Sequence, residues 1–544
     1  MTFKALWQQV NNKERRLIAL VSLVAIIIST APVVYGWLAT PAGKVFTGMH
    51  FVSADDWFVY YSYIGQAQQG RILFADLFAP LAHLPMLQPL WLVVGWLGWP
   101  LHLPAWATLN LGRVILIPLF FVMAYLFIAY LFKSEKVKQV ALWLLAFSSG
   151  CGWLMIYRLV QNPLNASQGQ FQWPMDLWVP DINTYYTLHT SPHFIAATIL
   201  LLIIFLATLL FTDRPRYYLA VIAGLAALSL FSFHPFQVIK VYVILALFFI
   251  VWWFKLRQIV WSQVFFGLVV FILSLPVSLY YLWLFRVDWL TTQRTLQNFN
   301  PTTPIYLTII SFGWLLVFAL IGVYFLLKRW KKITADELFL IVWLIVQLLL
   351  LYLPVSYQRR LGLGVHFPLV MLAVIAGVNF YQCYIVWFKK HLVSIITISF
   401  LLFLPSTFFV IAADLMVFSQ QRELSYLTKD AYQTFIWLKQ NTPATSIIFS
   451  DVKTGNVLPA YALRTSYVGH PVESPFYNQR KLEPAWFFSQ NRLAEEEINF
   501  LQQRRINYLF YGPREQLLGD YRPATKNYLR NVYQNQSVVI YQVL

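Results

Sequence analysis

The sequence predicts an all-α polytopic membrane bundle of about 11 transmembrane helices, followed by a small C-terminal α/β domain. Of its 544 residues, 59% are hydrophobic and only 11% are charged, a composition typical of membrane proteins. Apolar stretches recur along most of the chain at the length of about 20 residues that a bilayer crossing requires. After residue 413 the composition changes to that of a soluble domain.

The distribution of charge orients these predicted helices. The formal net charge is +18, and the Lys and Arg residues concentrate in the N-terminal tail and in short loops on one side. The longer loops on the other side hold few of them, which is the positive-inside pattern. We therefore expect an integral protein of the plasma or inner membrane, with a cytoplasmic N-terminus and an extracytoplasmic C-terminal domain. Because the basic residues do not gather on one soluble domain, their number does not indicate nucleic-acid binding.

The predicted membrane domain covers residues 1–413. Its spans are expected at about 17–38, 105–132, 139–157, 194–211, 219–233, from the His234-Pro235 turn to 254, 260–285, 305–327, 338–353, 365–388 and 392–413. A long first outer loop, 39–104, contains a predicted interfacial helix at 57–69, because Trp and Tyr favour headgroup depth. A second long outer loop covers 158–191.

The C-terminal part, 414–544, is expected to be an extracytoplasmic α/β domain. Its apolar periodicity predicts helices at 429–440 and 494–505 and strands at 446–451, 507–511 and 537–543. The chain contains no P-loop and no Gly-rich dinucleotide turn, so ATP-driven and redox chemistry have little support. Its two cysteines, Cys151 and Cys383, lie far apart in apolar segments and predict neither a disulfide framework nor a cysteine metal site. The pattern identifies no cofactor, and it neither requires nor excludes a divalent cation.

Asp55 and Asp56 are the first candidate site. They lie in the first outer loop at the start of the predicted aromatic helix, close to a membrane boundary where charge is costly. A catalytic role is the hypothesis that such a pair favours. The alternative is helix capping, since Asp is a preferred N-cap residue, and one Asp could cap while the other is catalytic.

Arg359 and Arg360 depart from the positive-inside trend, because they lie in an outer loop between two predicted spans. Guanidinium groups bind phosphate through paired hydrogen bonds, so the pair favours recognition of a lipid-linked phosphate. Snorkelling at the interface or a local ion pair is the alternative. Lys240, at the outer end of the sixth span, is a further candidate cation near the same site.

Other polar residues of the outer face complete the candidate substrate-binding set. His189 and His193 have i, i+4 spacing, but Pro192 makes a continuous helix doubtful, and no HExxH or cysteine ligand supports zinc. We expect these two histidines to form hydrogen bonds around a cavity or to lie at the interface. His234, beside Pro235, is expected to form a turn first and to be a site residue second. Asp181 and Tyr60 lie in the same outer loops. Arg113, inside the second span, requires a partner, and Asp76 is a candidate for it.

These features together resemble a known family. An Asp-Asp pair in the first outer loop, an aromatic helix, Gln69-Gly70-Arg71, a Pro-bounded apolar segment and Arg113 resemble the GT-C superfamily of membrane glycosyltransferases. The likeness is to enzymes that use polyprenyl-phosphate sugars, such as protein O-mannosyltransferases and lipid A aminoarabinose transferases. The stretches SIIFSDVKTGNVLPAYALRTSYVGHP and INYLFYG are similar to the outer domain of bacterial members of this group.

The resemblance implies transfer of a sugar from a polyprenyl-phosphate-linked donor to a lipid, glycan or protein acceptor on the outer face. Asp55 or Asp56 would be the general base, with Asp55 favoured by motif position, and Arg359 and Arg360 would stabilise the departing phosphate. The rival interpretation is a transporter or flippase of a lipid-linked saccharide. Such a protein should carry midplane polar residues or broken helices in paired halves. A non-catalytic scaffold whose outer domain binds a partner is a third class.

Overall fold

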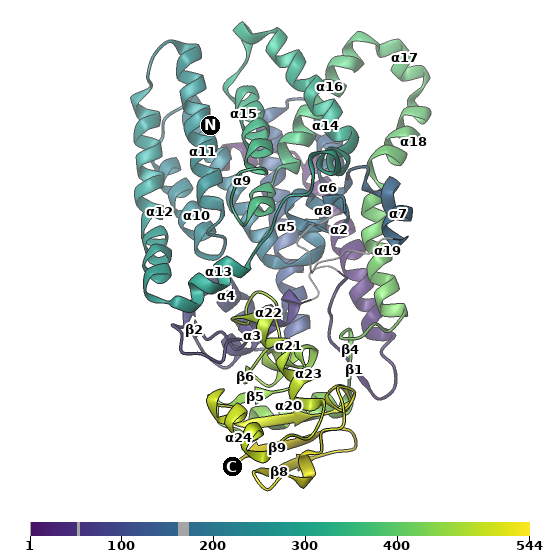
Figure 1. Ribbon diagram of the computed structural model, residues 1–544. Helices are drawn as coiled ribbons and strands as arrows, with labels where there is room; N and C mark the ends of the chain where they lie inside the picture. The colour runs from purple at the N-terminus through teal and green to yellow at the C-terminus, as the bar shows by residue number, and fades with distance from the viewer. Residues whose placement is uncertain (1, 52–54, 162–172) are drawn as a thin grey trace. The chain divides into compact units, whose positions relative to one another are not determined.

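The computed structural model of the chain describes residues 2–51, 55–161 and 173–544 (Figure 1). Parts of both predicted long outer loops, at 52–54 and 162–172, therefore lie outside the described residues. The chain divides into two compact units. Unit 1 comprises Met1–Pro32, Gly112–Leu282 and Phe299–Asp414, and unit 2 comprises Val33–Leu111, Trp283–Asn298 and Leu415–Leu544. The first outer loop is thus grouped with the C-terminal domain in unit 2.

Unit 1 is built from apolar helices. They are α2 (Asn12–Leu38), α5 (Ala105–Leu131), α6 (Glu135–Phe147), α9 (Pro192–Asp213), α10 (Tyr217–Phe233), α11 (Gln237–Leu256), α12 (Trp261–Val287), α14 (Ile305–Lys328), α15 (Ala335–Leu350), α16 (His366–Cys383), α18 (Leu392–Phe403) and α19 (Pro405–Ser419). One large cluster of buried Leu, Ile, Val and Phe side chains joins most of them. Pairs such as α9 with α10 and α14 with α16 pack against each other.

Within the described residues, eight helices are long and apolar enough to cross a membrane, or nine if the bent pair α18 and α19 counts as one span. The protein is therefore an integral membrane protein, but the predicted count of eleven spans is not confirmed. Two predicted spans form shorter helices, α10 with 17 residues and α15 with 16. The last predicted span is bent by 50° where Pro405 begins α19, because proline cannot continue the preceding helix.

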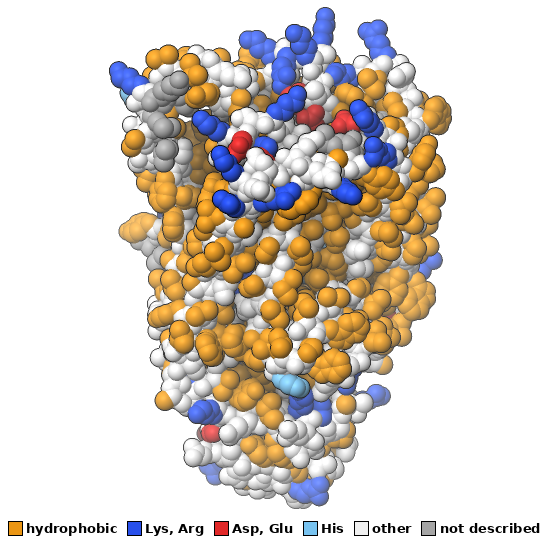
Figure 2. Space-filling view, turned by 180° about the vertical axis from the view of Figure 1, so that it is seen from behind, with side chains coloured by type: hydrophobic (Ala, Val, Ile, Leu, Met, Phe, Trp, Pro, Cys, Tyr) orange, Lys and Arg blue, Asp and Glu red, His pale blue; other side chains and the backbone are white. Residues whose placement is uncertain are grey.

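Basic side chains gather at one end of unit 1. Figure 2 shows a broad band of hydrophobic side chains on its flank and Lys and Arg at the upper end. The loops between α5 and α6, between α11 and α12, and between α14 and α15 lie at this end (Figure 1). We call it the basic end of unit 1. An apolar band bounded by charge is the surface that a bilayer requires of a spanning protein.

The C-terminal part of unit 2 contains a five-stranded sheet in the order β6-β5-β7-β9-β8. The strands are β5 (Ile447–Phe449), β6 (Thr465–Ser466), β7 (Tyr508–Tyr511), β8 (Leu529–Gln534) and β9 (Val539–Val543). The three predicted strands correspond to β5, β7 and β9, and the two predicted helices correspond to α20 (Lys429–Asn441) and α24 (Ala494–Gln503). β5 runs parallel to β6 and β7, whereas β9 is antiparallel to β7 and β8.

The first outer loop contributes to the core of unit 2. Its strand β1 (Lys44–Phe46) pairs with β4 (Tyr426–Thr428) of the C-terminal part. Helix α3 (Asp56–Gln68) packs against α4 (Pro89–Gly98) and α21 (Val452–Tyr461). Nine residues of α3 are buried, and seven of them belong to one hydrophobic cluster with side chains of the C-terminal sheet. The predicted interfacial helix is therefore a core helix, because its aromatic side chains satisfy a protein interior as well as a membrane interface.

Candidate functional site

The two adjacent carboxylates at the start of α3 have different partners. Asp56, in the first turn of α3, accepts a hydrogen bond from Nε2 of His470, with 3.1 Å between His470 Nε2 and Asp56 Oδ1. Asp55 accepts one from the Asn456 side chain on α21, with 3.3 Å between Nδ2 and Oδ1. Asp55 occupies the N-cap position, but among the described atoms its side chain forms no capping hydrogen bond. Capping therefore does not account for Asp55.

His470 lies in a short loop of the C-terminal part, Gly469-His470-Pro471-Val472-Glu473-Ser474. The loop approaches α21 closely: a Cβ atom on Gly469 would lie 2.5 Å from the backbone carbon of Gly455, so glycine is required at this contact. The backbone N–H groups of Val472 and Glu473 both donate to His470 Nδ1, each over 3.1 Å. These bonds leave the proton of a neutral imidazole on Nε2, where it is donated to Asp56.

A buried ionic cluster supports this loop. Arg294, on α13 (Trp289–Gln297), forms ion pairs with Glu473 and with Asp76, the latter over 3.5 Å between Nε and Oδ2. Asp76 also accepts a hydrogen bond from the backbone N–H of Phe78 at 2.9 Å. Gln297, on the same helix, donates to the backbone carbonyls of Val472 and Ser474. Because buried charges require partners, the cluster fixes α13, the first outer loop and the His470 loop together.

The surroundings of the two carboxylates give them different tendencies to bind a proton. Asp55 is an exposed residue, yet enough protein surrounds its carboxyl to withhold water and raise its pKa, with His470 opposing the rise and the Asp56 charge adding to it. Burial alone would lower the pKa of the His470 imidazole, but the hydrogen bond and charge of Asp56, with the charges of Glu473 and Asp55, raise it. Asp55 therefore holds a proton more readily than an ordinary aspartate, whereas Asp56 is engaged by its histidine.

Unit 1 contains a second polar group, which brings together most of the predicted cations. Arg360 lies 3.6 Å from the carboxylate of Asp181, measured between Nη1 and Oδ2. Arg359 stacks over the ring of Trp178 at 4.5 Å and donates to Asn300 at 2.5 Å. The charges of Arg360, Arg359 and Lys240 all act on Asp181. Burial raises the pKa of this carboxyl, and the three cations oppose the rise.

Lys240 is held close to the two arginines because it contacts the backbone of the turn that carries them. Residues Gln358–Gly362 form a 3-10 helix, and Gly364 follows in a left-handed conformation with a φ of +83°, which glycine adopts without strain. The Gly364 N–H donates to the Asp181 carbonyl at 3.2 Å. The Lys240 ammonium on α11 donates to the Leu363 carbonyl oxygen at 2.6 Å. Three cations thus surround one carboxylate, an excess of positive charge that suits a phosphate.

The predicted histidines fall into two groups. His193, at the start of α9, stacks on His234 with 5.1 Å between ring centroids. Phe194 contacts both rings and carries the Arg360 guanidinium at 5.7 Å. His189 ends on a different helix, α8 (Thr184–Thr190), because the helix breaks before Pro192. The i, i+4 spacing therefore does not place His189 and His193 on one continuous helix.

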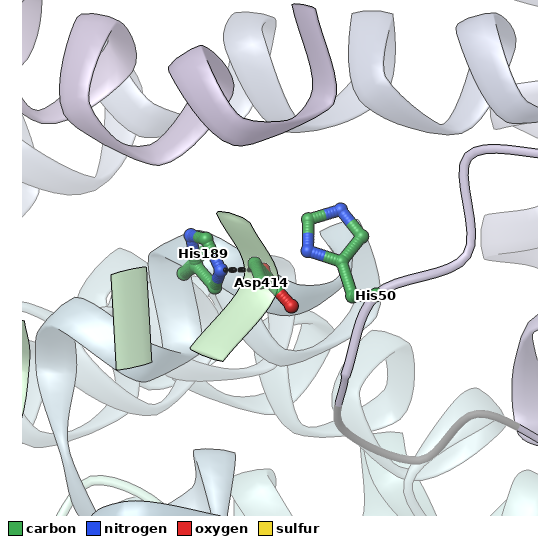
Figure 3. Close-up of side chains that lie close together, drawn as sticks. All are labelled: His50, His189 and Asp414. Carbon is green, nitrogen blue, oxygen red and sulfur yellow. Dashed lines mark hydrogen bonds and ion pairs between the residues drawn. The ribbon is translucent and has the colours of Figure 1, made fainter. Parts of the chain in front are cut away.

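His189 has a carboxylate partner of its own. Its Nε2 lies 2.5 Å from Oδ2 of Asp414, and a dashed line marks this contact in Figure 3. His50, also labelled there, belongs to unit 2 and stacks on Trp57 at 4.6 Å. An imidazole with a carboxylate is a combination that divalent metals bind.

Two further predictions concern Arg113 and Tyr60. Arg113 is buried and donates to the backbone carbonyls of Leu188 and Ser29, each at 3.1 Å. Asp76, the partner expected for it, pairs with Arg294 instead. The prediction of that pair was wrong because backbone carbonyls also satisfy a buried guanidinium. Tyr60 stacks on Trp91 with 4.6 Å between ring centroids.

Sequence reasoning missed His470, Glu473, Arg294 and Asn456. Arg294, like Arg359, is a basic residue in a predicted outer loop, so the same departure from the positive-inside trend could have identified it. His470 lies in the stretch TSYVGHP that carries part of the family resemblance. Its pairing with Asp56 joins residues separated by 414 positions, and no local pattern indicates such a contact.

No family model and no curated protein sequence matches the chain. Among solved structures, it is similar to the arabinofuranosyltransferase AftD from Mycobacteria, with a TM-score of 0.50 and 13% identity over 97% of this chain and 41% of that chain. It is also similar to ArnT from Cupriavidus metallidurans bound to undecaprenyl phosphate, with a TM-score of 0.48 and 12% identity over 95% of this chain and 97% of that one. The archaeal oligosaccharyltransferase AglB from Archaeoglobus fulgidus, in complex with an inhibitory peptide and a dolichol-phosphate, has a TM-score of 0.47 and 15% identity over 92% of this chain and 70% of that one.

These structural neighbours are GT-C glycosyltransferases. At such identities the likeness concerns the fold, and the similarity to AftD gives this chain the GT-C fold that its sequence predicts. A fold does not by itself define a reaction. The chemistry of this chain therefore has to be argued from its own carboxylates and cations.

Proposed function

We propose that this protein is a membrane glycosyltransferase that moves a sugar from a polyprenyl-phosphate-linked donor to an acceptor outside the cytoplasm. The observation that carries the proposal is the pair of carboxylates at the start of α3. One is held by an imidazole and the other is open to solvent with a raised pKa. A chain of GT-C fold with such a pair has the base that transfer to a hydroxyl acceptor requires.

Asp55 is the proposed general base. Its exposure lets an acceptor approach, and the hydrogen bond from Asn456 orients its carboxylate. A positioned base contributes about 10²–10⁴-fold in rate. Asp56, whose Oδ1 is engaged by His470, holds the start of α3 against the C-terminal part and adds a negative charge beside Asp55. It acts as a positioning residue.

Arg359, Arg360 and Lys240 are the proposed phosphate-binding residues. As the acceptor oxygen bonds to the sugar carbon, the bond from that carbon to the phosphate oxygen breaks and its electron pair stays on the departing polyprenyl phosphate. Preorganised cations stabilise the charge that develops there. Asp181 holds Arg360 in place. Among the described residues, His234 Nε2 is a buried atom without a hydrogen-bond partner, so it remains available to a substrate oxygen, with His193 stacked beside it. His189 and Tyr60 have protein partners that account for their positions, and we assign them no contact with the substrate.

The proposed orientation rests on the positive-inside trend. Lys and Arg in short loops favour the cytoplasmic side, and we propose that the C-terminal part of the chain is extracytoplasmic. A lipid-linked donor presented on that face and an extracytoplasmic acceptor agree with this orientation. Accessibility labelling of single cysteines, introduced at Lys331 in the basic end and at Asp520 in unit 2, tests it in intact cells.

The experiment that tests the function uses the purified protein in nanodiscs. A panel of polyprenyl-phosphate monosaccharides with a radiolabelled sugar is incubated with an extract of envelope lipids and glycans as acceptors. We expect label to enter the acceptor fraction as free polyprenyl phosphate is released. The transporter alternative predicts that, in proteoliposomes, the donor crosses the bilayer with its glycosidic bond intact. That result, without transfer in nanodiscs, would refute the proposal.

A further inference from the structure

A cavity of about 480 Å³ opens at the basic end of unit 1. Its walls are the end of α5, the start of α6, the first turns of α15 and the last turns of α16. These helices include three that are long and apolar enough to cross a membrane, so the cavity lies where lipid headgroups meet the protein. Leu131, Leu340, Ile375 and Val378 form its apolar wall, which suits the upper part of an acyl chain.

Acidic side chains line this cavity on α15, and a lysine lines it in the connection from α5 to α6. Asp336 and Glu337, from the first turn of α15, bring two carboxylates to it, and Asp213 lies close enough for its charge to act on Asp336. Among the described residues no Lys or Arg forms an ion pair with Asp336, whereas Glu337 pairs with Arg329. Lys133 lines the cavity as an exposed residue in the connection from α5 to α6. The lining thus holds two carboxylates and two cations. Because Glu337 and Arg329 neutralise each other, Asp336 and Lys133 are the charges that remain for a ligand.

Two helix C-termini and two amide side chains add further negative potential on the side of the cavity where the carboxylates lie. α5 and α16 end at the cavity, and helix C-termini carry a partial negative charge. Asn379 and Gln382, in the last turns of α16, add amide oxygens. The N-terminus of α15 is already capped, because Thr334 and Glu337 form a reciprocal capping box. The site therefore favours a cationic group beside Asp336 and an anionic group beside Lys133.

We propose that this cavity binds the headgroup of an ethanolamine phospholipid. Its primary ammonium has three N–H donors, which match Asp336 and the amide oxygens of α16, and its phosphate reaches Lys133. A choline headgroup has no N–H donor and carries methyl groups where these oxygens lie. An anionic headgroup such as phosphatidylglycerol could reach Lys133 but brings no cation for Asp336. The proposal concerns the basic end of unit 1 and does not depend on the proposed transfer reaction.

The test compares the full-length protein in nanodiscs of phosphatidylcholine alone, phosphatidylcholine with phosphatidylethanolamine, and phosphatidylcholine with phosphatidylglycerol. We expect a Tm higher by about 1 °C with phosphatidylethanolamine, and no comparable shift with phosphatidylglycerol. Asp336→Asn should abolish the shift and Lys133→Ala should reduce it. Glu135→Gln, at the same end of unit 1 but outside the cavity lining, should keep it.

Native mass spectrometry gives a second measurement for each variant, independent of folding stability. A bound phosphatidylethanolamine should remain on the wild-type protein and on Glu135→Gln, and it should be lost from Asp336→Asn. An equal or larger shift with phosphatidylglycerol would overturn the proposal. So would an ethanolamine-dependent shift that survives both Asp336→Asn and Lys133→Ala, because the effect would then come from the bulk bilayer.

Discussion

The charged groups of the two units have different kinds of hydrogen-bond partner. In unit 1, the buried cations Lys240 and Arg113 donate to backbone carbonyls, such as that of Leu363 beside Lys240. In unit 2, carboxylates at the start of α3 are held by side chains from a distant part of the chain, His470 and Asn456. The first arrangement suits an anion that must be bound firmly, and the second suits a carboxylate that must exchange a proton. The difference supports a division between phosphate binding in unit 1 and acid–base chemistry in unit 2.

The largest stability effect should come from the ionic cluster that supports the unit 2 site. Arg294→Met leaves Asp76 and Glu473 buried without their cation, which typically costs about 3–5 kcal/mol. Thermal unfolding of the purified variant should show a strongly lowered Tm. Arg530→Met, at an exposed position of β8, is the matched control and should change little. A loss below about 1 kcal/mol would show that the cluster does not hold the His470 loop.

Removing one cation from unit 1 should weaken donor binding by a smaller free energy. Arg359→Gln removes a charge from the group around Asp181, and a hydrogen bond to a charged group contributes about 1.5–3 kcal/mol. We expect the donor Kd to rise about 10–150-fold, with unfolding little affected, when binding of a fluorescent polyprenyl-phosphate sugar is measured. Arg214→Gln, in the exposed connection between α9 and α10, should leave the Kd unchanged. Equal affinities for both variants would remove Arg359 from the binding site.

The smallest effects are shifts in pH dependence, and their signs distinguish the neighbours of Asp55. A general base must be deprotonated, so the transfer rate should fall as pH decreases through the raised pKa of Asp55. Asp56→Asn removes a charge that raises this pKa, so the acidic limb of the rate profile should move to lower pH. The imidazole of His470 lowers this pKa when it is protonated, so His470→Asn should move the limb to higher pH. Shifts in the same direction for both variants would contradict these assignments.

The sequence indicates the candidate cations of unit 1 more directly than the polar contacts of unit 2, for a physical reason. A charge within apolar sequence is conspicuous, so Arg359, Arg360 and Lys240 could be identified by their cost in a membrane setting. The strands β5, β7 and β9 also follow from local periodicity. By contrast, the aromatic residues of α3 suit a membrane interface and a protein core equally, and only tertiary packing decides between them. His470 and Arg294 required the folded chain, because their partners lie in segments that sequence proximity does not connect.

The most direct test of the central claim measures donor binding and sugar transfer side by side in Asp55→Asn. If Asp55 is the general base, the donor Kd should stay within about threefold of wild type, because the substitution keeps the shape of the side chain. The transfer rate should then fall by about 10²–10⁴-fold. Asp520→Asn, an exposed carboxylate of unit 2, should retain both properties. A wild-type transfer rate in Asp55→Asn would contradict the account, whatever the donor affinity.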